Sequence, residues 1–169
     1  MRRTLLVLTG SAVLAGCGAS AHRDSTSAIT TKASVQTAPS AEARLEHGVR
    51  EAINQDHALS VQALWTNMVP SNHSATAGPQ LEALRQSVAQ RRAQGVRVKL
   101  LEEQFRIAAI HLEPSYSTAS ATVTDHERVQ PTYANGRPRG KAVTLNEQVR
   151  LELRRVGGTR FVVWKVTAS

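Results

Sequence analysis

The spacing of the apolar residues changes at Gly95, and this change constrains the fold more than any other feature of the sequence. Before it, Leu81, Leu84 and Val88 recur at intervals of three and four residues, which is the spacing of one face of an α-helix. Directly after it, residues 96–100 alternate between apolar and basic side chains, as in a half-buried β-strand. Helices followed by strands are typical of the α+β class. We therefore expect N-terminal helices packed on an antiparallel sheet.

Capping residues indicate where the helices begin and end. Ser40 is suited to the N-terminal cap of a first helix, whose apolar spacing slips in phase near Asp56 and His57. The slip predicts a kink or a break into two helices at that point. Pro79 is suited to the first position of the next helix, and Gly95 to its C-terminal cap.

Four signals describe the expected sheet. A slip in the alternation at residues 108–109 suggests a β-bulge, and the Asn-Gly pair at 135–136 is typical of a hairpin turn. Pro131 lies where a strand would otherwise run, so we expect an edge strand or a loop there. Residues 161–164 are apolar on both faces, as expected of a central strand.

Residues 1–16 have the layout of a secretory signal. Two arginines precede an apolar run that is too short to form a stable membrane span. The stretch from Leu14 to Cys17 (LAGC) then resembles the lipobox of bacterial lipoproteins, in which a signal peptidase cuts before the cysteine and the thiol carries a diacylglycerol. The resemblance implies a lipid anchor at Cys17 and a position on the extracytoplasmic face of the cell membrane.

Two alternatives remain open for this segment. Ordinary cleavage at the A-x-A triplet of residues 19–21 would release a soluble protein that lacks Cys17. Alternatively, Cys17 stays uncut and buried, against which the preceding apolar run argues. The Arg2-Arg3 pair also weakly resembles a twin-arginine export signal, which would change the export route but not the destination.

Residues 17–40 are expected to be the lipidated cysteine and a flexible stalk. They are rich in Ser and Thr and carry almost no large apolar side chain. Such a stretch cannot bury enough surface to offset the entropy of ordering it. The remaining residues, 41–169, then form a single α+β domain.

Most of the net charge of +8 lies near the C-terminus. Residues 128–169 carry nine basic and two acidic side chains, which gives +7. This asymmetry suggests contact with an anionic partner such as phospholipid headgroups or wall polymers, although a solvated strand face explains the alternating basic residues without a partner. The aromatic content of 4% is low for a protein that grips single-stranded nucleic acid by stacking. The candidate anion-binding residues are Arg137, Arg139, Arg150, Arg154, Arg155 and Arg160.

The order of the elements and the C-terminal pattern resemble the nuclear transport factor 2-like superfamily. After Gly157-Gly158, the segment Phe161-Val-Val-Trp164 is similar to an aromatic-Val-x-aromatic pattern often found in the last strand of that family. The resemblance covers about residues 41–167 and implies helices wrapped against a strongly curved sheet, a cone-shaped roll with a cavity. A cystatin-like fold is the alternative. Members often serve envelope assemblies or dimerise through the sheet, so an envelope protein partner or a homodimer is also implied.

Acidic residues beside histidines are the first candidates for catalysis, because enzymes of this superfamily place such side chains inside the cone. Asp56-His57 and Asp125-His126 are neighbours in sequence, and neighbours do not face one site on a helix or strand. We therefore expect surface positions for both pairs and predict no catalytic residue.

The histidines are scattered, without the close spacing of a metal site. His111 and Glu113 could put two ligands on one strand face, but two are too few to hold an ion. The sequence therefore predicts neither a metal site nor a cofactor.

Glu147 is a candidate cavity residue. It lies between Leu145 and Val149 on one face of a strand, where a carboxylate is costly unless it is paired or faces a cavity. Three interpretations are open. A bulge at residues 146–148 would turn the side chain out to solvent, an arginine or Lys165 would pair with it, or it would line a ligand-accepting cone.

Taken together, these patterns favour a lipid-anchored envelope protein with a non-catalytic binding or scaffolding domain. The alternatives are a small-pocket enzyme or ligand-binding protein of the same cone fold, and a binder of anionic surface polymers through the basic C-terminal strands.

The anchor can be tested at the cysteine itself. We expect Cys17→Ser to move the protein from the membrane fraction to the soluble fraction or to leave its signal uncut, because two acyl chains hold a protein to a bilayer where one barely does. Fractionation and the mass of the mature chain measure both effects. Unchanged membrane retention with normal cleavage would show that the anchor is not at this thiol.

Overall fold

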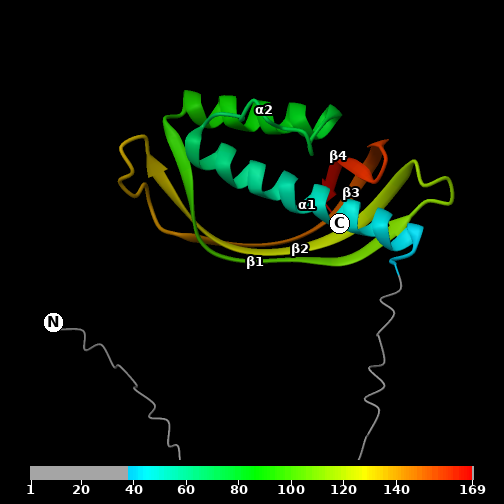
Figure 1. Ribbon diagram of the computed structural model, residues 1–169. Helices are drawn as coiled ribbons and strands as arrows, with labels where there is room; N and C mark the ends of the chain where they lie inside the picture. The colour runs from blue at the N-terminus through cyan, green and yellow to red at the C-terminus, as the bar shows by residue number, and fades with distance from the viewer. Residues whose placement is uncertain (1–37, 169) are drawn as a thin grey trace, which may run out of the picture. The chain divides into compact units, whose positions relative to one another are not determined.

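The computed structural model describes residues 38–168 of the protein (Figure 1). The predicted signal, Cys17 and nearly all of the predicted stalk lie outside these residues. The elements follow one another as α1 (Ala41–Thr66), α2 (Gly78–Ala93), β1 (Val96–Leu112), β2 (Thr118–Tyr133), β3 (Val143–Gly157) and β4 (Arg160–Ala168).

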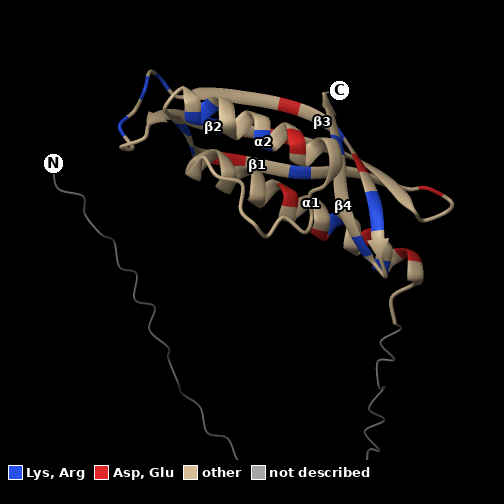
Figure 2. Ribbon diagram, turned by 90° about the horizontal axis from the view of Figure 1, so that it is seen from above, with Lys and Arg blue, Asp and Glu red and all other residues tan. Residues whose placement is uncertain are grey.

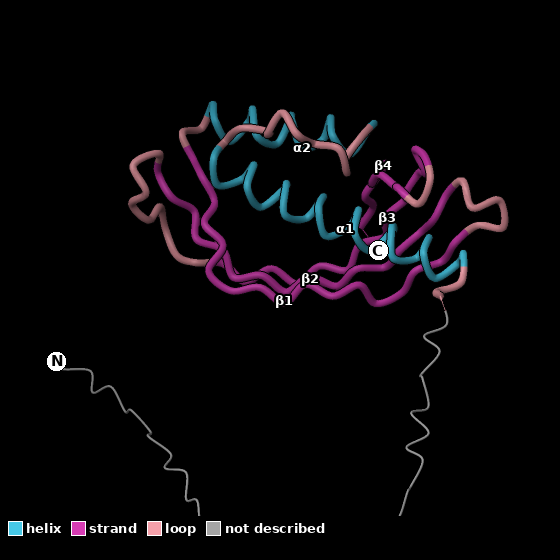
Figure 3. Tube along the Cα trace, in the orientation of Figure 1, coloured by secondary structure: helices cyan, strands magenta, loops and turns pink. Residues whose placement is uncertain are grey.

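The strands form one antiparallel sheet in the order β1-β2-β3-β4, and the helices lie over its concave face (Figures 1 and 3). Each strand pairs with the next one along the chain, so the sheet is a meander. The prediction of an α+β fold, with N-terminal helices on a curved antiparallel sheet, is confirmed. None of the described helices is long and apolar enough to cross a bilayer.

Helix α1 is one continuous helix of 26 residues, so the alternative of two helices divided at Asp56-His57 is wrong. The slip in phase arises because Asp56 occupies an inward position that the apolar residues otherwise fill. Its carboxylate accepts hydrogen bonds from Thr76 (2.5 Å) and Gln80 (3.5 Å), which replace the water it loses. The predicted cap is confirmed, since Ser40 Oγ accepts from the Ala43 amide at 3.1 Å.

Helix α2 begins and ends where the sequence predicts. Pro79 lies in its first turn, where a missing amide proton costs nothing. Gly95 follows the helix with a φ of +63°, and its amide donates to the Arg92 carbonyl at 3.1 Å. The left-handed conformation favours glycine and turns the chain directly into β1.

The sheet is curved where β1 carries irregularities. The predicted bulge is confirmed as a register shift between Ile107 and Ala109, and a second shift, not predicted, lies between Leu100 and Glu102. Bulges bend a strand and increase its twist. The two bulges therefore help to wrap the sheet around α1.

Two predictions concern the connection between β2 and β3. Pro131 lies within β2, opposite Val98, where β3 does not pair with the other side of β2, so the edge alternative is right and the loop alternative is wrong. It is tolerated because β3 pairs with β2 only as far as Val129, so no ladder partner is lost. The prediction of a hairpin turn at Asn135-Gly136 is confirmed: the Gly136 amide donates to the Tyr133 carbonyl at 2.9 Å, the Tyr133 amide donates to the Arg137 carbonyl at 2.9 Å, and Thr132 pairs with Pro138 across the turn. The connection then continues to residue 142 before β3 begins.

Strand β4 is the last strand of the sheet, so the prediction of a central position is wrong. Its apolar character has another cause. The segment before α2 bonds to the free edge of β4: the Val163 amide donates to Ala75 at 2.8 Å, and its carbonyl accepts from Ala77 at 3.0 Å. Phe161, Val162 and Val163 are therefore buried although the strand is terminal.

The main core lies between α1 and the concave face of the sheet. Val49 and Ile53 of the helix are almost fully buried against Val123, Leu153 and Val163 of the strands. At the N-terminal half of α1 the packing is especially close, because a Cβ atom built on Gly48 would lie 1.8 Å from the carbonyl oxygen of Thr159.

This close approach predicts that Gly48→Ala is destabilising. The methyl group would displace the backbone at Thr159, and overpacking of this kind lowers the free energy of unfolding by about 1–3 kcal/mol. The helix propensity of alanine alone would raise it by about 1 kcal/mol, so the sign of the change is diagnostic. Urea unfolding measures it, with His47→Ala at the adjacent exposed position as the control. A Gly48→Ala chain as stable as the parent would contradict the packing of α1.

Candidate functional site

A cavity of about 300 Å³ lies between α1 and the concave face of the sheet. Apolar side chains form part of its wall, among them Ile53, Phe105 and Leu151. The polar residues that line it are Asp56, His57, Ser60, Gln80, Arg91, Asp125, Glu127 and Glu147. A cavity that combines apolar walls with a few convergent polar groups is the usual form of a ligand site.

Strand register brings the carboxyl groups together. Asp125 and Glu127 lie two residues apart on β2 and so point to the same face. In the neighbouring strands Glu103 pairs with Glu127, and Glu147 pairs with Asp125. Four carboxyl groups from three strands therefore share one region of the concave face, where like charges repel.

Helix α1 adds His57 to this group. The ring of His57 stacks on Phe105, with centroids 4.0 Å apart and planes inclined by 20°. Its Nε2 atom contacts Oε1 of Glu103. The stacking and the polar contact together hold the imidazole against the carboxyl cluster.

Burial changes the protonation of two of the cavity carboxyls. Burial raises the pKa of Glu127 to about 7, and the neighbouring Asp125 carboxylate adds to the increase. Burial also raises the pKa of Asp125, while the nearby His57 lowers it. The two carboxyl groups influence each other: Glu127 lowers the pKa of Asp125, and Asp125 raises the pKa of Glu127.

Asp56 lies deeper, on the α2 side of the cavity. Burial raises its pKa to about 6, although the hydrogen bonds from Thr76 and Gln80 lower it. Arg91 of α2 also lines the cavity. Burial lowers the pKa of its guanidinium and the nearby Glu127 raises it.

Glu147 lines the cavity, one of the three positions left open by the sequence. The β2–β3 register runs without a shift through Asp125 and Glu147, so the bulge interpretation is wrong. Among residues 38–168 no ion pair to Glu147 is formed. Because the residue is also exposed, it lies at the mouth of the cavity.

The expectation that both Asp-His pairs lie on the surface is wrong for three of the four residues. Asp56 is buried, and it lines the cavity together with His57 and Asp125. Successive helix residues point about 100° apart, which still allows both to border one cavity. On β2 the alternation holds, and His126 faces away from the cavity, where it contacts Asn146.

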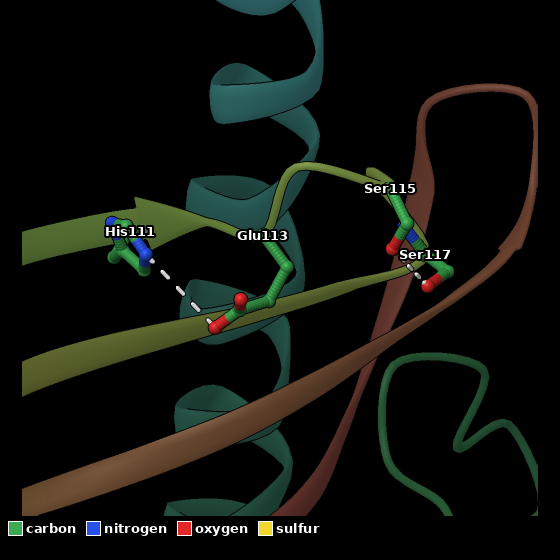
Figure 4. Close-up of polar contacts among 4 residues, drawn as sticks. All are labelled: His111, Glu113, Ser115 and Ser117. Atoms are coloured by element: carbon green, nitrogen blue, oxygen red, sulfur yellow. Dashed lines mark hydrogen bonds and ion pairs between the residues drawn. The ribbon is translucent and has the colours of Figure 1, made fainter.

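His111 and Glu113 lie near the β1–β2 turn, as Figure 4 shows, with 3.9 Å between His111 Nε2 and Glu113 Oε1. Both side chains are strongly exposed. The hydroxyl groups of Ser115 and Ser117 bond to each other at 2.7 Å in the same turn. The local contacts account for this group without a ligand.

The six candidate anion-binding arginines are divided between separate places (Figure 2). Arg137 and Arg139 lie in the loop after β2, whereas Arg154, Arg155 and Arg160 lie around the β3–β4 turn at the opposite end of the sheet (Figure 1). They therefore do not form the single connected surface that binding of an extended polymer would require.

Several of these arginines have local roles. Arg139 donates to the Gln94 carbonyl at 3.1 Å, and the Arg154 guanidinium lies 3.8 Å from the ring centroid of Trp164. The sixth, Arg150, lies on β3 opposite Thr122 and so points away from the helices. The density of positive charge alone does not identify these six arginines as an anion-binding site.

A second, largely apolar hollow of about 630 Å³ lies between the end of α1 and β1. It is lined by Trp65, which is 41% exposed, and by Val98 and Leu100. His57 and Glu127 line both hollows. Exposed apolar surface of this kind is what a partner site would need.

Comparison with known proteins supports the fold and nothing more specific. No protein-family model matches the chain, and no curated protein matches it significantly. The intermembrane space region of the chloroplast protein ARC6 is similar over 73% of this chain and 96% of that one, with a TM-score of 0.55 and 11% identity. At this identity the likeness shows the fold alone.

Two further structures, a conserved protein from Planctomyces limnophilus and a protein from Catenulispora acidiphila, match 73% of this chain. They cover 99% and 93% of their own chains at 17% and 15% identity. Their TM-scores of 0.41 and 0.39 are too low to support an argument.

The raised pKa of Glu127 predicts how stability depends on pH. Between about pH 4.5 and 7 the folded chain binds more protons at this residue than the unfolded chain, so its contribution to the free energy of unfolding is lost as pH rises through that window. Glu127→Gln should therefore gain stability relative to the parent between pH 4.5 and 7.5. Denaturant unfolding at both pH values measures this, with Glu82→Gln on the exposed face of α2 as the control. Equal pH dependence in the parent and Glu127→Gln would refute the assignment.

Proposed function

We propose that the chain is a lipid-anchored envelope protein whose nuclear transport factor 2-like domain binds a small, positively charged organic ligand in the cavity beneath α1. The observation that carries the proposal is the cluster of Asp125, Glu127 and Glu147 in the cavity wall. The anchor rests on the resemblance of Leu14–Cys17 to a lipobox.

Charge supports a cationic ligand. The pKa values of Asp125 and Glu127 are raised because burial and repulsion from neighbouring carboxylates disfavour the charged forms. A cation placed between them would relieve the repulsion and favour both charged forms. Arg91 lies on the α2 side of Glu127, whereas Glu147 lies at the mouth, so the ligand's positive end would meet carboxylates first.

Size and polarity support a small ligand with an apolar part. The cavity volume of about 300 Å³ is at the lower end of the range of about 300–1,000 Å³ for ligand pockets. Phe105, Leu151 and Val166 supply apolar wall beside the carboxyl groups. A primary amine on a short hydrocarbon ring or chain has the matching chemistry.

A second candidate is a small-pocket enzyme of the same fold. The observation in its favour is Glu127, because a carboxyl group with a pKa of about 7 is suited to proton transfer near neutral pH. The two candidate functions are distinguished by the fate of a ligand that occupies the cavity. A binding protein releases the ligand chemically unchanged, whereas an enzyme converts it.

Binding can be tested with three probes of similar shape and different charge. We expect cyclohexylammonium to raise the melting temperature of the purified full chain at pH 7.5, because a ligand that binds only the folded state stabilises it. Cyclohexanol should have a smaller effect, and cyclohexanecarboxylate none. Thermal unfolding followed by circular dichroism measures all three.

The matched variants are Glu127→Gln in the cavity and Glu152→Gln on the outer face of β3. The first should lose most of the stabilisation by cyclohexylammonium, and the second should keep it. Equal stabilisation by the three probes, or full retention in Glu127→Gln, would contradict the proposed function.

A further inference from the structure

Three potential metal ligands of different types converge at one side of the cavity. His57 of α1, Glu103 of β1 and Asp125 of β2 each offer one ligand atom, and these atoms all lie within 4.8 Å of one another. In a tetrahedral zinc site with bonds of about 2.0–2.1 Å, neighbouring ligand atoms are roughly 3.3 Å apart. Small side-chain rotations would therefore bring this set to coordinating distance.

We propose that His57, Glu103 and Asp125 form a binding site for a Zn²⁺ ion. The site goes beyond the proposed binding of an organic cation, because it depends on His57 and Glu103 and not on Glu127 or Glu147. The choice of metal follows from the donors: an imidazole nitrogen favours zinc and related transition metals, whereas calcium and magnesium prefer oxygen ligands throughout.

The surroundings hold two of the three ligands in place. Phe105 stacks on the His57 ring and pairs with Asp125 across the β1–β2 register. One aromatic side chain thus lies beside both the helix ligand and the strand ligand. Glu103 is the adjustable member, since its side chain is 30% exposed.

Asp125 supplies a second indication of a ligand. Its Oδ1 atom is shielded from solvent and accepts no hydrogen bond from the described part of the chain. A buried carboxylate oxygen without a partner is costly. Coordination to an ion would satisfy it.

The charge around the site also favours a divalent cation. Asp125 is influenced by the carboxylates of Glu103 and Glu147 as well as by Glu127, and Arg91 of α2 lies beside Glu127. Asp56 and His57 face this region from α1. Three protein ligands would leave one zinc position open toward the cavity, as in sites that hold an exchangeable ligand.

The test is a calorimetric titration of the untagged, chelator-treated full chain with ZnCl₂ at pH 7.5. We expect one equivalent to bind, and His57→Ala and Glu103→Gln each to weaken binding by about tenfold or more. Glu103→Gln preserves the side-chain shape, so it tests the ligand even where His57→Ala disturbs the helix packing. Circular dichroism of each variant confirms the fold.

The controls are His111→Ala and His126→Ala, whose side chains lie outside the cavity. Both should bind zinc as the parent does. The proposal is overturned if the parent takes up no zinc, if these control variants lose the binding, or if His57→Ala and Glu103→Gln both retain it.

The outcome for zinc is separable from the outcome for the organic ligand. Cyclohexylammonium should still stabilise Glu103→Gln if the proposed function is right, whether or not zinc binds. Because Asp125 belongs to both sites, saturating zinc should weaken the effect of cyclohexylammonium on the parent chain. If zinc and cyclohexylammonium bind independently, zinc does not occupy the cavity. The result for cyclohexylammonium binding would be unaffected.

Discussion

The packing of α1 across the concave face of the sheet is the contact on which the rest of the structure depends. Along its N-terminal half the helix lies so close to the sheet that Gly48 has no room for a side chain beside Thr159, and Val49 and Ile53 are buried in the core. One turn further on, polar side chains replace apolar ones on the inward face. The same helix therefore packs on the apolar core along its N-terminal half and covers a cavity lined by carboxyl groups further along.

The carboxyl groups of this cavity lower the stability of the folded chain. The carboxyl groups of Asp125 and Glu127 lose water on folding and lie near other carboxylates, which raises the pKa of both groups. Protons relieve the repulsion at low pH, and a bound cation would relieve it at neutral pH. Carboxyl groups placed this way beside His57 contribute little to the core. A cluster of perturbed groups in a cavity is therefore a candidate functional site, and both proposed cations follow from its charge.

Much of the fold could be predicted because it follows from local periodicity and capping. The change of period at Gly95 predicts helices followed by strands, and Ser40 and Pro79 mark helix starts. The errors arose where tertiary contacts replace local rules. Asp56 sits inside an apolar stripe because Thr76 reaches it from another segment. The terminal strand β4 is apolar because residues 75–77 cover its edge.

The candidate site could be predicted from the sequence less well than the fold could. Alternation along β3 put Glu147 on the same strand face as Leu145 and Val149 but left open whether it faced solvent, a paired cation or a cavity. Its neighbours depend on strand register, which sequence spacing does not reveal. His57, Glu103 and Asp125 are far apart in the chain and come together only through the β1–β2 pairing and the path of α1. In the sequence His57 stands beside Asp56, and Asp125 beside His126. In the fold His57 and Asp125 come together with Glu103 instead, and sequence neighbours do not reveal this group.

The most direct measurement is a titration of the Asp and Glu side-chain carboxyl carbons in the full chain by ¹³C nuclear magnetic resonance. Glu127→Gln identifies the Glu127 signal. The account predicts a midpoint of about pH 7 for Glu127 and a midpoint above the ordinary aspartate value for Asp125. Midpoints at the ordinary values for both residues would show that the cavity does not hold a cluster of partly buried, interacting carboxyl groups, and would remove the basis for the proposed organic cation.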